Sequence, residues 1–224
     1  MIYRLTKSKF ILGLQCEKAL YLDVYKPQLA YFAPETLTRF RKGRNFESKI
    51  KALFPNAIDI SQKCGRNIQK YPELTAQILA QPGEMNLYEA GFVYNEVLVL
   101  ADVVHKDDDG NISIYEIKNS VSVKDVFRRD VCIQHYVISH CIDNLISFSV
   151  IYNDGDDNPL YEELLPEAKE AEPLIAKQVE RFKDILQGTE PYIETGTQCI
   201  TPYDCPYRRY CEGKITAQLE LGGF

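Results

Sequence analysis

Three ionisable side chains lie where two apolar runs of the sequence end. Asp102 follows the apolar run 97–101, and Glu116 and Lys118 close the second run. Residues i and i+2 of a strand share a face, so Glu116 and Lys118 point the same way. If the two runs pair as neighbouring strands, two carboxylates and one amine converge on a single site.

A short acidic turn, Asp108-Asp109-Gly110, lies between the two runs. Runs rich in Val, Leu and Ile on both sides of such a turn predict a β-hairpin. In a three-residue loop, Gly110 takes the left-handed conformation that closes the turn. This register places Asp102 directly opposite Glu116, with Cβ atoms about 5 Å apart.

Such a trio has a recognisable chemistry. Two adjacent carboxylates repel each other, and one takes up a proton unless a cation lies between them. Carboxylate oxygens suit Mg²⁺ or Mn²⁺, which also keep waters and accept phosphate oxygens. A metal-bound water loses its proton more easily, and Lys118 could hold that water or neutralise charge at phosphorus. The pattern therefore indicates metal-assisted phosphodiester hydrolysis.

The alternative is an exposed strand face whose charges form only weak surface ion pairs. The run 97–101 is apolar at every position, as in a strand that is buried on both faces. Charged residues at the end of such a strand are harder to explain as solvent-exposed surface residues without a function. This setting favours the metal site.

The composition bounds the class of protein. A chain of 224 residues can bury a substantial core, and it contains no apolar run of transmembrane length and no signal peptide. We therefore expect a cytoplasmic protein without a membrane partner. The net charge of −6 argues against non-specific coating of nucleic acid, yet it allows a local basic groove. Basic residues gather at positions 39–51, 128–129 and 208–209, although solvated helix faces would look the same.

The remaining pattern predicts the elements that position the trio. Helices are expected over residues 8–22, with Ser8 as the N-cap, and over 34–54, which carries Glu47. A strand is expected from Glu89 to residue 94. A further helix follows the capping pattern at residues 122–125 and runs to about residue 143. A strand over 145–152 and an amphipathic helix over 167–187 complete the pattern.

Gln134 falls within the apolar stripe of the helix that follows Lys118. Its amide therefore faces the sheet, and a buried amide needs hydrogen-bond partners. It could bond only to backbone, or it could orient a ligand or the strand that carries Glu116.

The seven cysteines do not suggest a disulfide framework, because the number is odd and the expected compartment is reducing. Three cysteines near the C-terminus, Cys199, Cys205 and Cys211, have five residues between each neighbouring pair. They look like metal ligands that lack a fourth, and Cys16 is the best remaining candidate for the fourth ligand. Four thiolates suit zinc or an iron–sulfur cluster. The close Cys-x₂₋₄-Cys pairs of zinc ribbons are missing, and the alternative is cysteines without a ligand.

The order of these motifs resembles the PD-(D/E)XK nuclease superfamily. The resemblance is strongest to the RecB-like branch that includes the CRISPR-adaptation iron–sulfur exonucleases. Several members of that branch carry one cysteine near the N-terminus and three near the C-terminus. The segments that carry the resemblance are Ser8-Lys9-Phe10, residues 14–22 around Cys16, Gly43-x-x-x-Glu47, Glu89, Ala101-Asp102, Glu116-Ile117-Lys118, Gln134 and Cys205-Pro206-Tyr207 with Cys211.

The resemblance implies an α/β, restriction-endonuclease-like fold with a mixed central sheet flanked by helices. It implies one nuclease-like domain over residues 1–213, with a tail over 214–224. A cysteine-ligated staple of helix and loop would join residues 8–22 to residues 195–212.

The resemblance also assigns roles to individual residues. Asp102 and Glu116 would bind the metal together with the Ile117 carbonyl, and Glu89 or Glu47 would complete its coordination. Lys118 would assist the attacking water, and Gln134 would match the family's glutamine. The four cysteines that would hold a 4Fe–4S cluster are Cys16, Cys199, Cys205 and Cys211.

We therefore expect an Mg²⁺- or Mn²⁺-dependent deoxyribonuclease that acts on DNA ends or single strands. Two other functions stay open: a non-catalytic nucleic-acid-binding protein on a nuclease-like fold, and a zinc-stabilised interaction protein.

Overall fold

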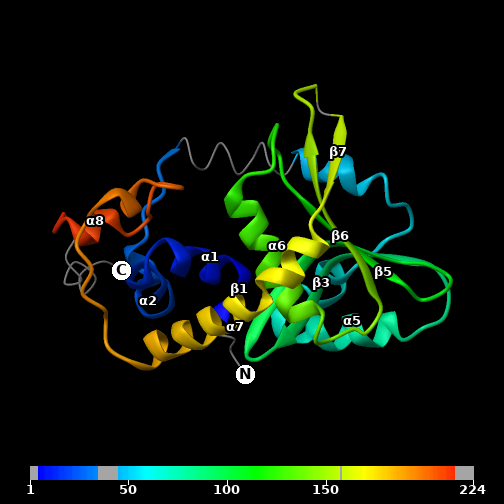
Figure 1. Cartoon of the computed structure of the whole chain (residues 1–224), viewed down its shortest axis with the longest axis horizontal. Coiled ribbons are helices and arrows are strands. Elements are labelled where there is room, and N and C mark those ends of the chain that lie inside the picture. Colours follow the sequence, from blue (N-terminus) through cyan, green and yellow to red (C-terminus); the bar gives the residue numbers. More distant parts are fainter. Residues whose placement is uncertain (1–4, 35–44, 157, 215–224) are drawn as a thin grey trace.

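A mixed sheet with helices packed against it organises the molecule (Figure 1). The computed structural model describes residues 5–34, 45–156 and 158–214. Over that part of the chain, seven strands form one sheet in the order β2-β3-β4-β5-β6-β7, with β1 pairing with β4. The strands are β1 Leu5–Thr6, β2 Ile58–Asp59, β3 Met85–Tyr94, β4 Val97–Lys106, β5 Ile112–Ile117, β6 Leu145–Asn153 and β7 Pro159–Glu163. The predicted mixed α/β architecture is confirmed.

The predicted hairpin is formed by β4 and β5. Val103 pairs with Tyr115 and Lys106 with Ile112 in an antiparallel ladder. Gly110 has φ +84, and its N–H donates to the carbonyl of Asp107 at 3.0 Å, so the turn has the expected left-handed glycine.

Helices cover the sheet and extend beyond it. They are α1 Lys7–Gln15, α2 Glu17–Tyr25, α4 Ile60–Cys64, α5 Tyr71–Leu79, α6 Asp125–Ile138, α7 Leu165–Gln187 and α8 Arg208–Cys211, with 3₁₀ turns at Pro27–Leu29, Ile68–Lys70 and Thr197–Cys199. Residues 45–51 are also helical, as is residue 34. The basic residues at 39–44 and Gly43 lie outside the described residues.

The single helix predicted over residues 8–22 is wrong, because the chain breaks it into α1 and α2 at Cys16. Cys16 is extended, with φ −162 and ψ 118, and Thr6 rather than Ser8 caps α1 by accepting the Lys9 N–H. The Gln15 amide anchors this junction by donating to the carbonyls of Gln198 and Tyr203, both at 2.7 Å. Contact with the C-terminal segment therefore overrides helical continuity.

The limits predicted for α6 also need correction. The helix starts at Asp125 without a side-chain cap, rather than with a cap from Ser122, and ends at Ile138. Ahead of it, the N–H of Asn153 bonds the carbonyl of Ser120, which ties this segment to β6. After the helix, the carbonyl of Asn144 accepts the N–H of Ile112 at 2.9 Å, so the chain must already have turned toward β6.

The core lies on both faces of the sheet. A large cluster joins α6 and α7 to the strands through fully buried side chains such as Val131, Phe148 and Phe182. On the opposite side, Phe46 and Ile50 of the helical segment 45–51 pack against Ile117. Successive strand residues point to opposite faces, so Glu116 is left facing α6.

A third, smaller cluster lies beside the sheet, where α1 and α2 meet the segment around α8 (Figure 1). The Tyr31 N–H donates to the Pro206 carbonyl at 2.9 Å, which joins the segment after α2 to the segment before α8. We call this unit, residues 16–31 and 197–213, the cysteine lobe.

Candidate metal site

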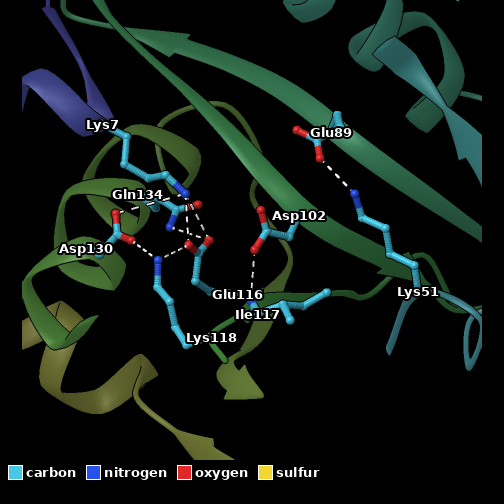
Figure 2. A network of polar contacts seen from close by, with 9 residues as sticks. All are labelled: Lys7, Lys51, Glu89, Asp102, Glu116, Ile117, Lys118, Asp130 and Gln134. Atoms are coloured by element: carbon cyan, nitrogen blue, oxygen red, sulfur yellow. Dashed lines mark hydrogen bonds and ion pairs between the residues drawn. The ribbon is translucent and has the colours of Figure 1, made fainter. Parts of the chain in front are cut away.

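Three acidic residues stand side by side on adjacent strands. The β4–β5 register, continued by one step from Val103 and Tyr115, places Asp102 opposite Glu116. The β3–β4 pairs on either side of Glu89 place it opposite Asp102 as well. Figure 2 shows Asp102 between the other two acids. The expected pair is therefore the core of a row of three.

Asp102 is held by the backbone of the neighbouring strand. Its Oδ2 accepts the Ile117 N–H at 2.8 Å. Burial, followed by the Glu116 carboxylate, raises the pKa of the Asp102 carboxyl to about 7 against the opposing effect of Lys7 and Lys118. The Ile117 contact runs through its amide, so the predicted ligation by its carbonyl stays a prediction.

Glu116 is 2% exposed and has hydrogen-bond partners at both oxygens. Oε1 accepts from Lys118 at 2.6 Å and from Lys7 at 2.9 Å. Oε2 accepts from Gln134 at 2.8 Å and from Lys7 at 3.1 Å. Burial opposes the charged form, but the two ammonium groups outweigh it and lower the pKa of Glu116. Gln134 thus faces inward as predicted, and its amide binds the Glu116 carboxylate.

Two residues of the network around Glu116 were not predicted, Lys7 and Asp130. Asp130 pairs with Lys118 and lies one helical turn before Gln134, so it shares that face of α6. This i, i+4 spacing from Gln134 was the sequence signal that could have indicated Asp130 as a residue of the site. Lys7 comes from the start of α1, 109 residues from Glu116 in sequence, and no local pattern indicates their contact.

The three charges around Glu116 respond to burial and to one another. Burial raises the pKa of Asp130 despite the two lysines. For Lys118, burial would lower the pKa, but Asp130 and Glu116 raise it well above its ordinary value. For Lys7 the same balance applies, and its pKa is also raised. Both amines are therefore held as ammonium ions.

The two candidates for a further acidic ligand, Glu89 and Glu47, share a different partner. The Lys51 ammonium binds Glu47 Oε1 at 2.6 Å and Glu89 Oε1 at 2.8 Å. Glu89 also has φ +54, a left-handed conformation that costs a non-glycine residue about 1 kcal/mol or more. Lys51 therefore joins Glu47 to Glu89, the outer member of the row.

Four of the seven cysteines meet in the cysteine lobe. Cys199 and Cys205 are buried there, and Cys16 and Cys211 pack against them. Burial, with a smaller contribution from the other three thiols, raises the pKa of the Cys205 thiol to about 11. None of the seven, all within the described residues, forms a disulfide. The four cysteines selected from the sequence are therefore one neighbourhood.

Neither neighbourhood is a ready-made metal cage. Among the described residues, no group of three or more His, Cys, Asp or Glu side chains is arranged to hold a metal ion. At the carboxylates, Figure 2 shows ammonium groups between Glu116 and Asp130.

A cleft of about 1290 Å³ connects the two neighbourhoods. One end is lined by Lys7, Glu47, Lys118 and Asp130, and the other by residues of the cysteine lobe. At that far end the Arg209 guanidinium lies 3.5 Å from the centre of the Tyr31 ring.

The comparisons with known proteins bear on the fold alone. No family model and none of the curated proteins matches the chain. Nineteen chains of solved structures do match, and one is the crystal structure of SSO0001. That structure has a TM-score of 0.51 and 15% sequence identity, and the match covers 95% of this chain and 87% of the other. The similarity supports the mixed α/β fold over nearly the whole chain.

None of the helices in the described ranges is long and apolar enough to cross a membrane.

Proposed function

We propose that this chain is an Mg²⁺- or Mn²⁺-dependent deoxyribonuclease of the PD-(D/E)XK superfamily that acts on DNA ends or single strands. The observation that carries the proposal is the placement of Asp102 opposite Glu116, with Lys118 bonded to Glu116 at the wall of the cleft.

The donor chemistry fits a hard divalent cation. Asp102 and Glu116 would hold it through carboxylate oxygens, and Glu89 or Glu47 would complete its coordination. Buried acceptors without a hydrogen-bond partner among the described residues, Asp130 Oδ1 and Gln134 Oε1, also mark the site as incomplete. The bound metal would supply an acidified water. Lys118 would stabilise charge that develops on the phosphate, and Gln134 would keep Glu116 in orientation.

The cleft supports a nucleic acid as the substrate. Tyr31, Phe32 and Tyr203 are each more than 40% exposed, and all three line it with Arg208 and Arg209. Aromatic rings with cations beside them suit unpaired bases and a phosphate backbone. This local chemistry is compatible with an overall net charge of −6, because binding depends on where charge lies.

For the cysteine lobe we propose a 4Fe–4S cluster held by Cys16, Cys199, Cys205 and Cys211. Four thiols in one partly buried cluster suit that group, and four-cysteine zinc is the alternative. Its role would be to staple the chain ends.

One observation favours a second candidate, a nucleic-acid-binding protein without catalysis. Both Glu116 oxygens already accept hydrogen bonds from protein donors. In that case the acids would be structural and the cleft would still bind a strand.

The decisive experiment is digestion of end-labelled single- and double-stranded DNA with Mn²⁺. Wild type should cleave and lose activity with a chelator, whereas Asp102→Ala and Lys118→Ala should lower the rate by about 100-fold or more. Asp109→Ala, an exposed acid in the turn of the same hairpin, is the matched control and should cleave like wild type. Strand binding without cleavage in wild type would establish the second candidate, and full activity in both variants would reject the assigned site.

A further inference from the structure

Lys7 is the member of the site that has no part in the proposed chemistry. Its ammonium donates to both oxygens of Glu116, at 2.9 and 3.1 Å, and its side chain is 18% exposed. Together with Lys118 and Gln134 it occupies the acceptor positions of the carboxylate that a metal must reach. A cation that enters this site must therefore displace a donor from Glu116.

Of the three donors, Lys7 is the one that has a second, unoccupied acceptor nearby. Its Nζ already lies 4.0 Å from Asp130 Oδ1. That oxygen is buried, has no hydrogen-bond partner among the described residues, and belongs to a side chain that is 9% exposed. A short swing of the flexible lysine stem would exchange Glu116 for Asp130. The exchange satisfies an acceptor that is otherwise buried without a hydrogen bond among the described residues.

The other two donors are held more firmly. Lys118 already bonds Asp130 Oδ2 as well as Glu116, and Gln134 is fully buried on α6. Lys7, by contrast, is the first residue of α1, whose far end is fixed in the cysteine lobe by Gln15. The helix therefore stays in place while the side chain alone moves.

We propose that Lys7 is a built-in competitor of the divalent cation: its ammonium closes Glu116 in the metal-free site and moves to Asp130 when the metal binds. This inference rests on the proposed function and adds a control of metal affinity to it. The competition is electrostatic as well as steric, because a retained ammonium beside Glu116 repels a divalent cation.

The test is Mn²⁺ binding measured by isothermal titration calorimetry in the absence of DNA. Lys7→Met should bind Mn²⁺ about 10-fold or more tightly than wild type, and Lys7→Arg, which keeps the charge, should not. Lys9→Met is the matched control, since Lys9 is on the same helix and lines the same cleft but is 4.0 Å from Asp23 instead. Its affinity should equal that of wild type.

A double-mutant cycle tests the movement to Asp130. Asp130→Asn should weaken Mn²⁺ binding more in wild type than in the Lys7→Met background, because only the former needs a receiver for the ammonium. An equal effect in both backgrounds would reject Asp130 as that receiver.

The outcomes separate the two proposals. Wild-type binding that Lys7→Met leaves unchanged or weakens overturns the role of Lys7 but leaves the nuclease assignment standing. Absence of Mn²⁺ binding in wild type and all variants overturns the proposed function and the competitor with it. Far-UV circular dichroism and a thermal melt of each variant verify folding, and Lys7→Gln replaces Lys7→Met if the latter fails to fold.

Discussion

The charges of the described residues around Glu116 do not balance. Asp102, Glu116 and Asp130 bring three carboxyl groups, whereas Lys7 and Lys118 bring two ammonium groups. Asp102 has no ammonium within ion-pair distance among the described residues and accepts a backbone N–H instead. Asp102 is therefore the carboxyl group whose negative charge is not compensated. The proposed metal would supply a positive charge at this position.

This imbalance predicts a pH-dependent effect of Asp102→Asn on the stability of the metal-free protein. The folded-state pKa of Asp102 is about 7, above its ordinary value, because of burial and the nearby Glu116. Between pH 4 and pH 7 the folded state keeps a proton that the unfolded chain releases, so wild type loses stability as the pH rises through this window. Asp102→Asn removes that loss and can still accept the Ile117 N–H.

We expect the stability of Asp102→Asn relative to wild type to increase by about 1–3 kcal/mol from pH 5 to pH 7. Urea unfolding in chelator at both pH values measures it. Asp109→Asn, in the exposed turn, should show no such change. A difference that is constant with pH would contradict the assigned environment of Asp102.

Prediction from sequence succeeded at the residue scale where the signal was local. The acidic turn and the apolar runs determine the register of the hairpin, and that register places Asp102 opposite Glu116. The contact of Lys7 with Glu116 depends on how α1 docks, which is a tertiary event. The bridge from Lys51 to Glu89 likewise depends on a left-handed residue inside a strand, for which the sequence gives no cue.

At the scale of elements, α6 is the support of the site. It presents Asp130 and Gln134 on one face, one turn apart, toward the strand of Glu116 (Figure 2). The inward amide was predictable because it interrupts an apolar stripe. The helix ends were not, since the expected Ser122 cap is absent and the helix stops at Ile138.

Removing the amide of α6 should weaken the fold. In Gln134→Met the side chain keeps its approximate length, but Glu116 Oε2 loses a buried donor at 2.8 Å. A hydrogen bond to a charged group contributes about 1.5–3 kcal/mol, so the free energy of unfolding should fall by that amount. Urea unfolding of the metal-free protein gives the value. Arg129→Met, at an exposed position of the same helix, is the control, and an equally small loss in both variants would argue against the role of Gln134.

At the scale of the whole molecule, segments from the N-terminal and C-terminal parts of the described chain meet in the cysteine lobe, and the cleft lined by part of this lobe is also lined by Lys7, Lys118 and Asp130. The spacing of the cysteines grouped Cys199, Cys205 and Cys211 and left Cys16 as the best fourth candidate, whereas the joining of the two segments was implied by the family resemblance. The break between α1 and α2 at Cys16 was not predictable from helical periodicity. Local propensity favoured one helix, and the contact of Gln15 with the C-terminal segment overrode it.

The lobe gives a prediction about the stability of the entire chain. A cluster bound by Cys16 and Cys205 closes a loop of about 190 residues, and a cross-link of that span contributes about 5 kcal/mol in the chain-entropy model. Cys205→Ser should therefore lower the melting temperature by about 10 °C. Anaerobically purified wild type should contain iron and sulfide, and the variant should lose both.

Cys141→Ser is the matched control, because Cys141 is exposed and lies outside the lobe. It should keep both the metal content and the melting temperature of wild type. If zinc were found in place of iron and sulfide, the cysteines would still cross-link the two segments, but the bound group would be a zinc ion, since four thiolates hold either group. A Cys205→Ser protein with unchanged melting temperature and metal content would show that the four thiols are a packed cluster, and that hydrophobic contacts rather than a ligated group join the ends of the chain.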